Sequence, residues 1–326
     1  MTARHYFFVK AVVTGVIFSL FLLSCDPQPC TEGSCPDGQV CWTNGYCSPE
    51  VTAASGPGEA PENATSECDL PPLWCDSETE DCAELIQFDP TCGDGYADFP
   101  ENGETEDNQY RSWLRRDTVY LIQYASARVA CLAENWGYGN GGPLGLIDMS
   151  EADGAIPGTS IGSPGHPAGT HTNGFDIDVA YYQKNTGDNR ARVICDDWDN
   201  HCIDFPDILD EWRTALFLGS LYEHPDLRVV GADGRAGGMI EQAFEQLCAW
   251  GWITEEACQV EHKFAYEIID EGWGFYRFHH HHMHISFSGT SADNASSRSG
   301  INDDVPCITR DCDMETVEAF YAETFQ

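Results

Sequence analysis

The chain has 326 residues, of which 42% are hydrophobic and 12% aromatic, so it can bury a full core and is not a disordered protein. Its 16 basic and 54 acidic side chains give a formal net charge of -38. A surface of this charge repels phosphate backbones, so we expect no nucleic-acid partner, and the acidity is explained most simply by solubility.

The first 24 residues have the composition of an export signal. Arg4 and Lys10 are followed by an apolar stretch over residues 11–23, which is too short to span a membrane as a mature helix. Residues 22–25, Leu-Leu-Ser-Cys, resemble a bacterial lipobox, which implies that Cys25 is lipidated and tethers the chain to a membrane. The alternative is an ordinary secretory signal with Cys25 as a disulfide partner. The expected location is therefore the periplasm or cell envelope with a lipid anchor, or the extracellular space.

Sixteen cysteines in an exported chain indicate disulfides rather than metal-thiolate clusters. Four of them fall between residues 30 and 47, in a stretch with too few aliphatic residues for a core, and predict two bridges. Short spacings favour the pairs Cys195–Cys202, Cys248–Cys258 and Cys307–Cys312. Linker composition after residue 47 indicates a boundary, so we expect a Cys-rich segment and linker over 25–67 and the main domain, with a Cys-rich lead-in, over 68–326.

Hydrophobic periodicity predicts helices alternating irregularly with short strands in the main domain. Helices are expected over 121–132, 206–221 and 238–250, and strands over 144–147, 175–182, 227–231 and 282–287. Because there is no regular strand-helix-strand rhythm, the predicted fold class is α+β, a mainly antiparallel sheet with flanking helices.

The strand over 175–182 carries a candidate half of a metal site. Asn173-Gly174 is a turn signal, and the turn would let His171 fold back toward the strand that follows it. Asp176 and Asp178 share one face of that strand because side chains alternate, so Asp178 can meet His171. Such a pattern alone is weak evidence, since an Asp on the polar face of a strand is usually just solvated.

The second half is the run of residues 279–284, which holds five histidines in six positions. In a strand, His280, His282 and His284 would point one way and His279 and His281 the other. Two imidazoles and one carboxylate form the ligand set of a catalytic zinc with an open position for water. The alternatives are an engineered tag, a loose metal-scavenging tract or a pH-sensitive cluster.

His-x-x-Gly-x-x-x-Asp followed by His-x-His is similar to the pattern of the zinc peptidases that include lysostaphin and the D-Ala-D-Ala carboxypeptidases. Within them the chain most resembles the penicillin-insensitive murein endopeptidases, whose motifs occur here in order between about residues 120 and 288. The matching positions are Asp148-Met149-Ser150, Gly165-His166, residues 174–178, and His279, His282 and His284.

This resemblance implies one Zn²⁺ per chain, held by His171, Asp178 and His284, with His282 as the catalytic imidazole and His279 in support. Since the chain has no His-Glu-x-x-His, His282 is the natural general base, and the competing role for it is a fourth ligand.

Two further residues are expected to act around the ligands. Asp176 is expected to orient a zinc-binding histidine. His166 lies five residues before His171, where the family has three, so we expect it at most in an outer contact. The extra histidines His280 and His281 also fall outside the family pattern.

The predicted function is a zinc metallopeptidase that hydrolyses amide bonds in peptidoglycan cross-links or stem peptides. The alternative is a non-catalytic, zinc-stabilised cell-wall-binding lipoprotein on the same fold. A peptidase acting on other peptides is a third possibility.

Overall fold

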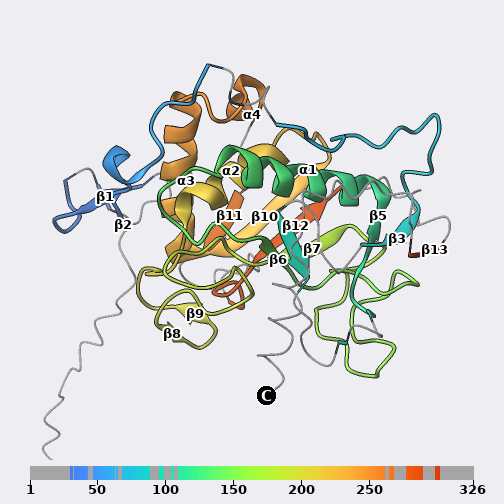
Figure 1. Ribbon diagram of the computed structural model, residues 1–326. Coiled ribbons are helices and arrows are strands. Elements are labelled where there is room, and N and C mark those ends of the chain that lie inside the picture. Colours follow the sequence, from blue (N-terminus) through green and yellow to red (C-terminus); the bar gives the residue numbers. More distant parts are fainter. Residues whose placement is uncertain are drawn as a thin grey trace, which may run out of the picture.

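The computed structural model describes residues 30–288 and 298–301, apart from short internal stretches (32, 43–46, 63, 65–67, 89–94, 99–103, 106–108, 261–263 and 268–276). Helices and sheet form separate layers (Figure 1). The helices are η1 (Ala53–Ser55), α1 (Arg116–Leu132), α2 (Glu211–Leu221), α3 (Gly234–Ala249) and α4 (Glu255–Gln259).

The largest sheet has six strands in the order β11-β10-β12-β7-β6-β4. The pairs along its centre, β10 with β12, β12 with β7 and β7 with β6, are antiparallel, and the two outer pairs are parallel. The predicted α+β class with a mainly antiparallel sheet is therefore confirmed. Its strands are β4 (Tyr96–Asp98), β6 (Leu144–Leu146), β7 (Asp176–Val179), β10 (Leu227–Asp233), β11 (Phe264–Glu267) and β12 (Met283–Phe287).

Smaller sheets surround this one. A three-stranded sheet has the order β13-β3-β5, and two hairpins pair β1 with β2 and β8 with β9. Their strands are β1 (Gln39–Cys41), β2 (Cys47–Pro49), β3 (Leu85–Gln87), β5 (Trp113–Arg115), β8 (Asp197–Trp198), β9 (His201–Cys202) and β13 (Arg298–Ile301).

The three long helices cover one face of the six-stranded sheet (Figure 1). Side chains that alternate along the two central strands, Ile177 and Val179 on β7 and Met283 and Ile285 on β12, are fully buried in the main hydrophobic core. The intervening residues of both strands, among them Asp178, therefore point to the opposite face. In Figure 1 that face carries the loops around residues 150–170 and the β8–β9 hairpin. The helices thus build the core, and the loops enclose the polar side of the sheet.

One predicted helix begins later than expected. Residue 206 is a proline that could open a helix, but α2 begins at Glu211. The physical reason is the cap: the Asp210 carboxylate accepts a hydrogen bond from the backbone N–H of Arg213 at 3.0 Å. The segment before Asp210 is irregular and is held by a backbone hydrogen bond from Lys184 to the Ile208 carbonyl.

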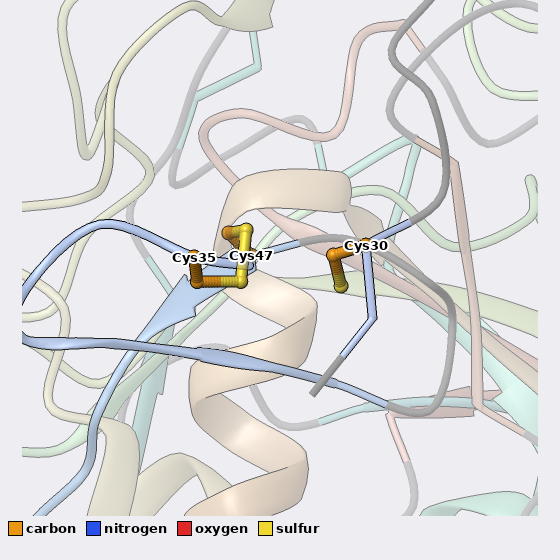
Figure 2. A group of neighbouring side chains, drawn as sticks. All are labelled: Cys30, Cys35 and Cys47. Atoms are coloured by element: carbon orange, nitrogen blue, oxygen red, sulfur yellow. A yellow bond between two sulfur atoms is a disulfide. The ribbon is translucent and has the colours of Figure 1, made fainter. Parts of the chain in front are cut away.

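The Cys-rich start is stapled as expected. Cys30 pairs with Cys41 and Cys35 with Cys47, which closes the β1–β2 hairpin. Figure 2 shows that the sulfurs of Cys30, Cys35 and Cys47 lie near one another, with the Cys35–Cys47 bond drawn between two of them. Because a sulfur in a disulfide is not a thiolate, this group is not a metal site in the oxidised protein.

The segment after β2 does not run free of the main domain. The backbone N–H of Val51 donates to the Gln242 side chain at 3.1 Å, and the Trp252 indole donates to the Gly58 carbonyl at 2.6 Å. Gly56 lies so close to the Trp212 and Trp250 rings that a Cβ there would meet them at 2.8 and 2.7 Å. Linker composition indicated a boundary here but did not predict these contacts.

Further disulfides tie the main domain together. The predicted pairs Cys195–Cys202 and Cys248–Cys258 are present, together with Cys75–Cys82 and the long-range Cys68–Cys131. Six bridges indicate an oxidising, non-cytoplasmic compartment. Among the residues described, no helix has the length and apolar composition needed to cross a membrane. The predicted lipobox with Cys25 and the predicted pair Cys307–Cys312 lie outside the described residues.

Candidate metal centre

The register of two antiparallel strands brings together residues that are about a hundred positions apart. On β12, His284 lies directly opposite Asp178 of β7, and Ser286 lies opposite Asp176. Directly opposed residues in such a pair have their Cβ atoms about 5 Å apart, close enough for their side chains to touch. As a result, Nδ1 of His284 lies 2.9 Å from Oδ1 of Asp178.

His171 reaches the same point from the turn before β7. His171, Asn173 and Gly174 have positive φ angles of 50°, 56° and 71°, so the chain reverses within four residues, as the Asn-Gly signal predicts. The Asp176 carboxylate fixes the turn by accepting the His171 backbone N–H at 3.0 Å. Nε2 of His171 consequently lies 3.3 Å from Oδ1 of Asp178 and 3.1 Å from Nδ1 of His284.

These three donor atoms fit a tetrahedral metal ion, and we call His171, Asp178 and His284 the primary triad. Ligands about 2.0 Å from a zinc ion in tetrahedral geometry are about 3.3 Å from one another. The three distances within the primary triad, 2.9, 3.1 and 3.3 Å, are close to that value. The three side chains are buried, His171 completely. Buried donor atoms that converge in this way are suited to a shared cation.

The electrostatics of the metal-free site favour a positive charge between the carboxylates. Burial alone would lower the pKa of His284, but hydrogen bonds and charge attraction from Asp176 and Asp178 raise it to about 9. Burial raises the pKa of both carboxyl groups, yet the histidines around them outweigh this effect and lower it, strongly for Asp178. The metal-free site therefore holds a proton on His284 at neutral pH.

This proton predicts a pH-dependent zinc affinity. Zinc binds the neutral imidazole, and His284 is protonated below pH about 9, so binding at neutral pH must displace one proton. We expect the affinity to rise about tenfold per pH unit from pH 7 and to level off near pH 9. Competition with a chromophoric chelator between pH 6.5 and 9.5 measures this slope. A constant affinity over that range would show that His284 does not exchange a proton for the metal.

Asp176 lies behind the primary triad, as expected of a residue that orients a ligand. Its Oδ1 is 3.3 Å from Nε2 of His284, the ring nitrogen opposite the one that faces Asp178. The Ser286 hydroxyl donates to the same oxygen, and the Arg228 guanidinium donates to Ser286 through Nε at 3.0 Å. Ser286 was not predicted, although its position two residues after His284 places it on the same face of the strand.

Asp176→Asn is expected to lower zinc affinity about 10- to 100-fold without unfolding the chain, because a neutral amide holds the imidazole less firmly and makes it a weaker base. Metal competition with purified protein measures the effect. Asp226→Asn, which changes an exposed carboxylate, is the matched control and should bind zinc as the wild type does. Equal affinity for both variants would mean that Asp176 does not act on the metal ligands.

The histidine run does not form a continuous strand. β12 begins at Met283, and residues 279–282 are irregular, following Phe278 with its positive φ of 70°. The predicted alternation is therefore wrong for the first half of the run. His280 turns away from the site, with Nε2 3.8 Å from Asp197, whereas the His279 ring lies on the site side with its centroid 5.1 Å from that of His282.

His282 contacts the primary triad from the side. Its Nε2 lies 3.4 Å from Oδ2 of Asp178, the oxygen that the two triad histidines do not share. Burial holds the pKa of His282 well below its usual value, against the opposing effect of Asp178, and burial likewise lowers the pKa of His279 to about 4. Both rings are therefore neutral at pH 7. The Tyr181 hydroxyl fixes this segment by donating to the His279 carbonyl at 2.9 Å.

His166 reaches the site despite its unusual spacing. A turn closed by the Thr170 N–H and the Pro167 carbonyl, with Gly169 at φ 93°, takes up the additional residues before His171. The His166 and His171 ring centroids are 3.9 Å apart, and donor atoms of His166, His171 and Asp178 all lie within 4.8 Å of one another. His166 therefore contacts the candidate ligands directly, which is closer than its spacing led us to expect.

Asp148 and Arg111 complete the surroundings. Nε2 of His166 lies 2.8 Å from Oδ2 of Asp148, and Oδ1 of Asp148 forms an ion pair with Arg111. Arg111 also contacts Glu104 through Nε at 3.3 Å, and all three of these charged side chains are buried. The Asp-Met-Ser motif drew attention to Asp148 without giving it a role, and no feature of the sequence pointed to Arg111 or Glu104.

The comparisons with known proteins found no family model and no curated protein that matches this chain.

Proposed function

We propose that the chain is a zinc metallopeptidase of the cell envelope that hydrolyses amide bonds in peptidoglycan peptides. The observation that supports the proposal most is the convergence of two imidazoles and one carboxylate within 3.3 Å of one another, with two neutral imidazoles beside them. Three protein ligands leave a tetrahedral ion one position for water or substrate, which is typical of catalytic rather than structural zinc.

The role of each residue in the proposed reaction is inferred from the position of its side chain. Zinc bound by the primary triad would supply Lewis acidity that polarises a scissile carbonyl and activates a water molecule. His282, next to Asp178, would accept the proton of the attacking water and return it to the leaving amine. Asp176 would keep the His284 ring oriented. His279, whose Nδ1 is 2.7 Å from the Arg277 carbonyl, would hold its other nitrogen toward the substrate.

Peptidoglycan as the substrate rests on the motif resemblance and on the compartment. The motifs occur in the family's order, and polar side chains from each of them lie in contact with one another: Asp148, His166, Asp178, His282 and His284. The six disulfides among the described residues indicate an oxidising, non-cytoplasmic compartment, where cell-wall peptides would be accessible.

Digestion of purified muropeptide dimers tests this function. We expect the zinc-loaded chain to convert dimers to monomers, a chelator to stop the reaction, and added zinc to restore it. Liquid chromatography with mass spectrometry identifies the bond cleaved. A zinc-loaded, folded chain that leaves dimers and stem peptides intact would contradict the proposal. If such a chain cleaves only unrelated peptides, it is a peptidase that acts on substrates other than peptidoglycan.

The second candidate is a non-catalytic, zinc-stabilised binding lipoprotein, and one observation favours it. His282 lies near enough to Asp178 to act as a fourth ligand, which would close the site. His282→Ala separates the two functions. A general base contributes about 10²- to 10⁴-fold to the rate, so the peptidase should lose that much activity and keep its zinc.

The same variant gives the opposite result for a binding protein. If His282 is a ligand, His282→Ala weakens zinc binding and the wild type shows no hydrolysis. Zinc content by mass spectrometry and cleavage rate are measured on the same samples. His280→Ala is the control from the same histidine run, because His280 faces Asp197 instead of the site.

A further inference from the structure

We propose that the β8–β9 hairpin and Phe278 form a surface that binds the sugar chain of peptidoglycan beside the candidate metal centre. The choice of peptidoglycan rests on the proposed function, because the sugar chain carries the peptides whose amide bonds would be cleaved. Binding at this surface does not require zinc. Its two aromatic rings belong to Trp198 and Phe278, and we call them the aromatic pair.

Exposed hydrophobic side chains gather at this hairpin. Of the six large hydrophobic side chains that are exposed in the described part of the chain, four lie here: Val193, Trp198, Ile203 and Phe278. Trp198 is 67% exposed and Phe278 is 58% exposed. Single exposed hydrophobic residues are common, whereas a cluster of them typically marks a binding surface. The aromatic pair is therefore the part of this surface that we expect to contact a ligand.

The pairing of the hairpin explains why Trp198 faces solvent. Trp198 lies opposite His201, with their ring centroids 6.1 Å apart. Asp197 lies opposite Cys202. Cys202 is buried, and Oδ2 of Asp197 lies 3.8 Å from Nε2 of His280, so this side of the hairpin faces the protein. Because side chains alternate between the two faces of a strand pair, the side that carries Trp198 faces outward.

Phe278 is held at the surface by a strained backbone. Its φ of 70° lies in the left-handed region, which is unfavourable for a bulky L-residue. Two contacts with the hairpin turn maintain it: the Phe278 N–H donates to the Asn200 carbonyl at 2.7 Å, and Arg277 pairs with Asp199 at 2.9 Å. Strain of this kind persists mainly at functional sites. Packing does not explain it here, because the ring is exposed.

The surface is rigid and adjoins the candidate metal centre. The Cys195–Cys202 disulfide closes the hairpin, and the buried Asp233 carboxylate accepts the Cys202 N–H at 2.9 Å. Phe278 directly precedes His279, and Figure 1 shows the orange chain before β12 next to the hairpin. A rigid surface binds without the cost of ordering a loop. A sugar bound here would lie next to the site that cleaves the attached peptide.

The side chains around the aromatic pair fit a sugar. The C–H face of a sugar ring packs on the electron-rich face of an aromatic ring, and sugar hydroxyl groups donate hydrogen bonds to carboxylates and amides. Asp196, Asp197 and Asn200 are exposed acceptors close to Trp198 in the hairpin. Phe278 is hydrogen-bonded to Asn200, two residues from Trp198, so adjacent sugar units of one chain can reach both rings.

Other ligands of exposed aromatic rings fit less well. Nucleobases stack on such rings, but a chain with a net charge of -38 repels the attached phosphates. An ammonium group would suit the carboxylates and the rings, but the exposed Arg277 guanidinium next to Phe278 would repel it. A second copy of the chain would carry the same net charge, and the two copies would repel each other. An uncharged sugar meets none of these obstacles.

Binding of a peptide-free sugar tests the surface directly. The probe is the tetramer of N-acetylglucosamine, which has the uncharged backbone of the peptidoglycan sugar chain. Titration of the full chain, followed by nuclear magnetic resonance, should show binding with and without zinc. Trp198→Ala should weaken it about 2- to 10-fold, the range expected for one aromatic contact.

Trp74→Ala is the matched control and should bind the tetramer as the wild type does. It also removes an exposed tryptophan, but Trp74 stacks on His224 with ring centroids 4.6 Å apart. His224 precedes β10, whereas the hairpin contacts Asp233 at the far end of that strand.

Phe278→Gly separates binding from folding. Glycine adopts a positive φ without strain, so this variant should unfold at a temperature no lower than the wild type. Its affinity for the tetramer should nevertheless fall, by a factor similar to that of Trp198→Ala. A lower Tm with unchanged affinity would show that Phe278 serves the fold and not a ligand.

The link to peptidoglycan is tested with muropeptide dimers that keep their sugars and with the same dimers after an amidase has removed them. The wild type should have the lower KM for the sugar-bearing dimers. Trp198→Ala should lose this preference, and Trp74→Ala should keep it. A preference that persists in Trp198→Ala would show that the sugar is recognised elsewhere.

Three further results would overturn the inference. The tetramer does not bind the wild type, or binds Trp198→Ala and Phe278→Gly equally well. Maltotetraose binds as tightly as the tetramer, so the surface does not select the wall sugar. The wild type is a dimer that Trp198→Ala dissociates, so the surface is an interface between copies. The test is independent of the proposed function: tetramer binding without hydrolysis would refute the peptidase and keep the sugar-binding surface, and hydrolysis without sugar binding would do the reverse.

Discussion

Replacing His284 with alanine is expected to remove zinc from the primary triad and to abolish hydrolysis of muropeptide dimers. In the proposed site His284 would supply one of three ligands, and its loss leaves Asp178 and His171 without the nitrogen that lies within 3.1 Å of both. The loss of zinc affinity should exceed the about 10- to 100-fold caused by removing an outer partner of a ligand. Metal competition and the cleavage rate measure the two effects on the same preparation.

His280→Ala is the matched control for this experiment. It removes a buried imidazole from the same run, but His280 faces Asp197 and the β8–β9 hairpin. Zinc affinity and hydrolysis should both stay near the wild-type level. If His280→Ala loses zinc and His284→Ala keeps it, the side-chain directions of the run described above are wrong and the primary triad is not the metal site.

Much of the primary triad could be predicted because it depends on local geometry. The alternation of side chains in a strand puts Asp176 and Asp178 on one face, and the Asn-Gly signal predicts the turn that returns His171 to them. These two rules need only neighbouring residues. The structure confirms the strand, the turn and the common face.

The direction of each histidine in the run could not be obtained in this way. Alternation applies only within a strand, and the place where β12 begins is set by its pairing with β7, which ends at Val179 opposite Met283. Before that pair the chain is not constrained by a ladder of hydrogen bonds. His280 is instead placed by its carbonyl, which accepts the Ile194 N–H from the neighbouring loop at 3.1 Å.

Contacts between segments that are distant in the sequence could not be predicted either. Cys68–Cys131 spans 63 residues, and nothing in the spacing favours it over other pairs. Arg111 and Glu104 reach the site by folding and belong to no recognisable motif. For His166 the spacing in the sequence predicted at most an outer contact with the site. The turn that follows it instead brings its ring against that of His171. The fold class and ligand types follow from the sequence, whereas the partners around them require the tertiary structure.

Gly174→Ala is expected to destabilise the metal-free chain by about 3 kcal/mol. Gly174 has a φ of 71°, in the left-handed region that costs an L-residue about 1–2 kcal/mol. An added Cβ would also meet the Arg115 backbone nitrogen and a Leu85 methyl group, each at 2.5 Å, and crowding of this kind costs about 1–3 kcal/mol. Backbone atoms cannot move aside as the end of a flexible side chain can, so the turn itself must shift.

Because Gly174 lies between His171 and Asp178, such a shift should disturb the candidate metal site as well as the fold. Thermal unfolding with a chelator present should show a Tm lower by about 6–12 °C, and zinc affinity should fall in the part of the protein that remains folded. Gly187→Ala is the control, since a Cβ there meets no atom within 4 Å. An equal Tm for both variants would mean that the turn before β7 can be rebuilt without strain and does not fix the position of His171.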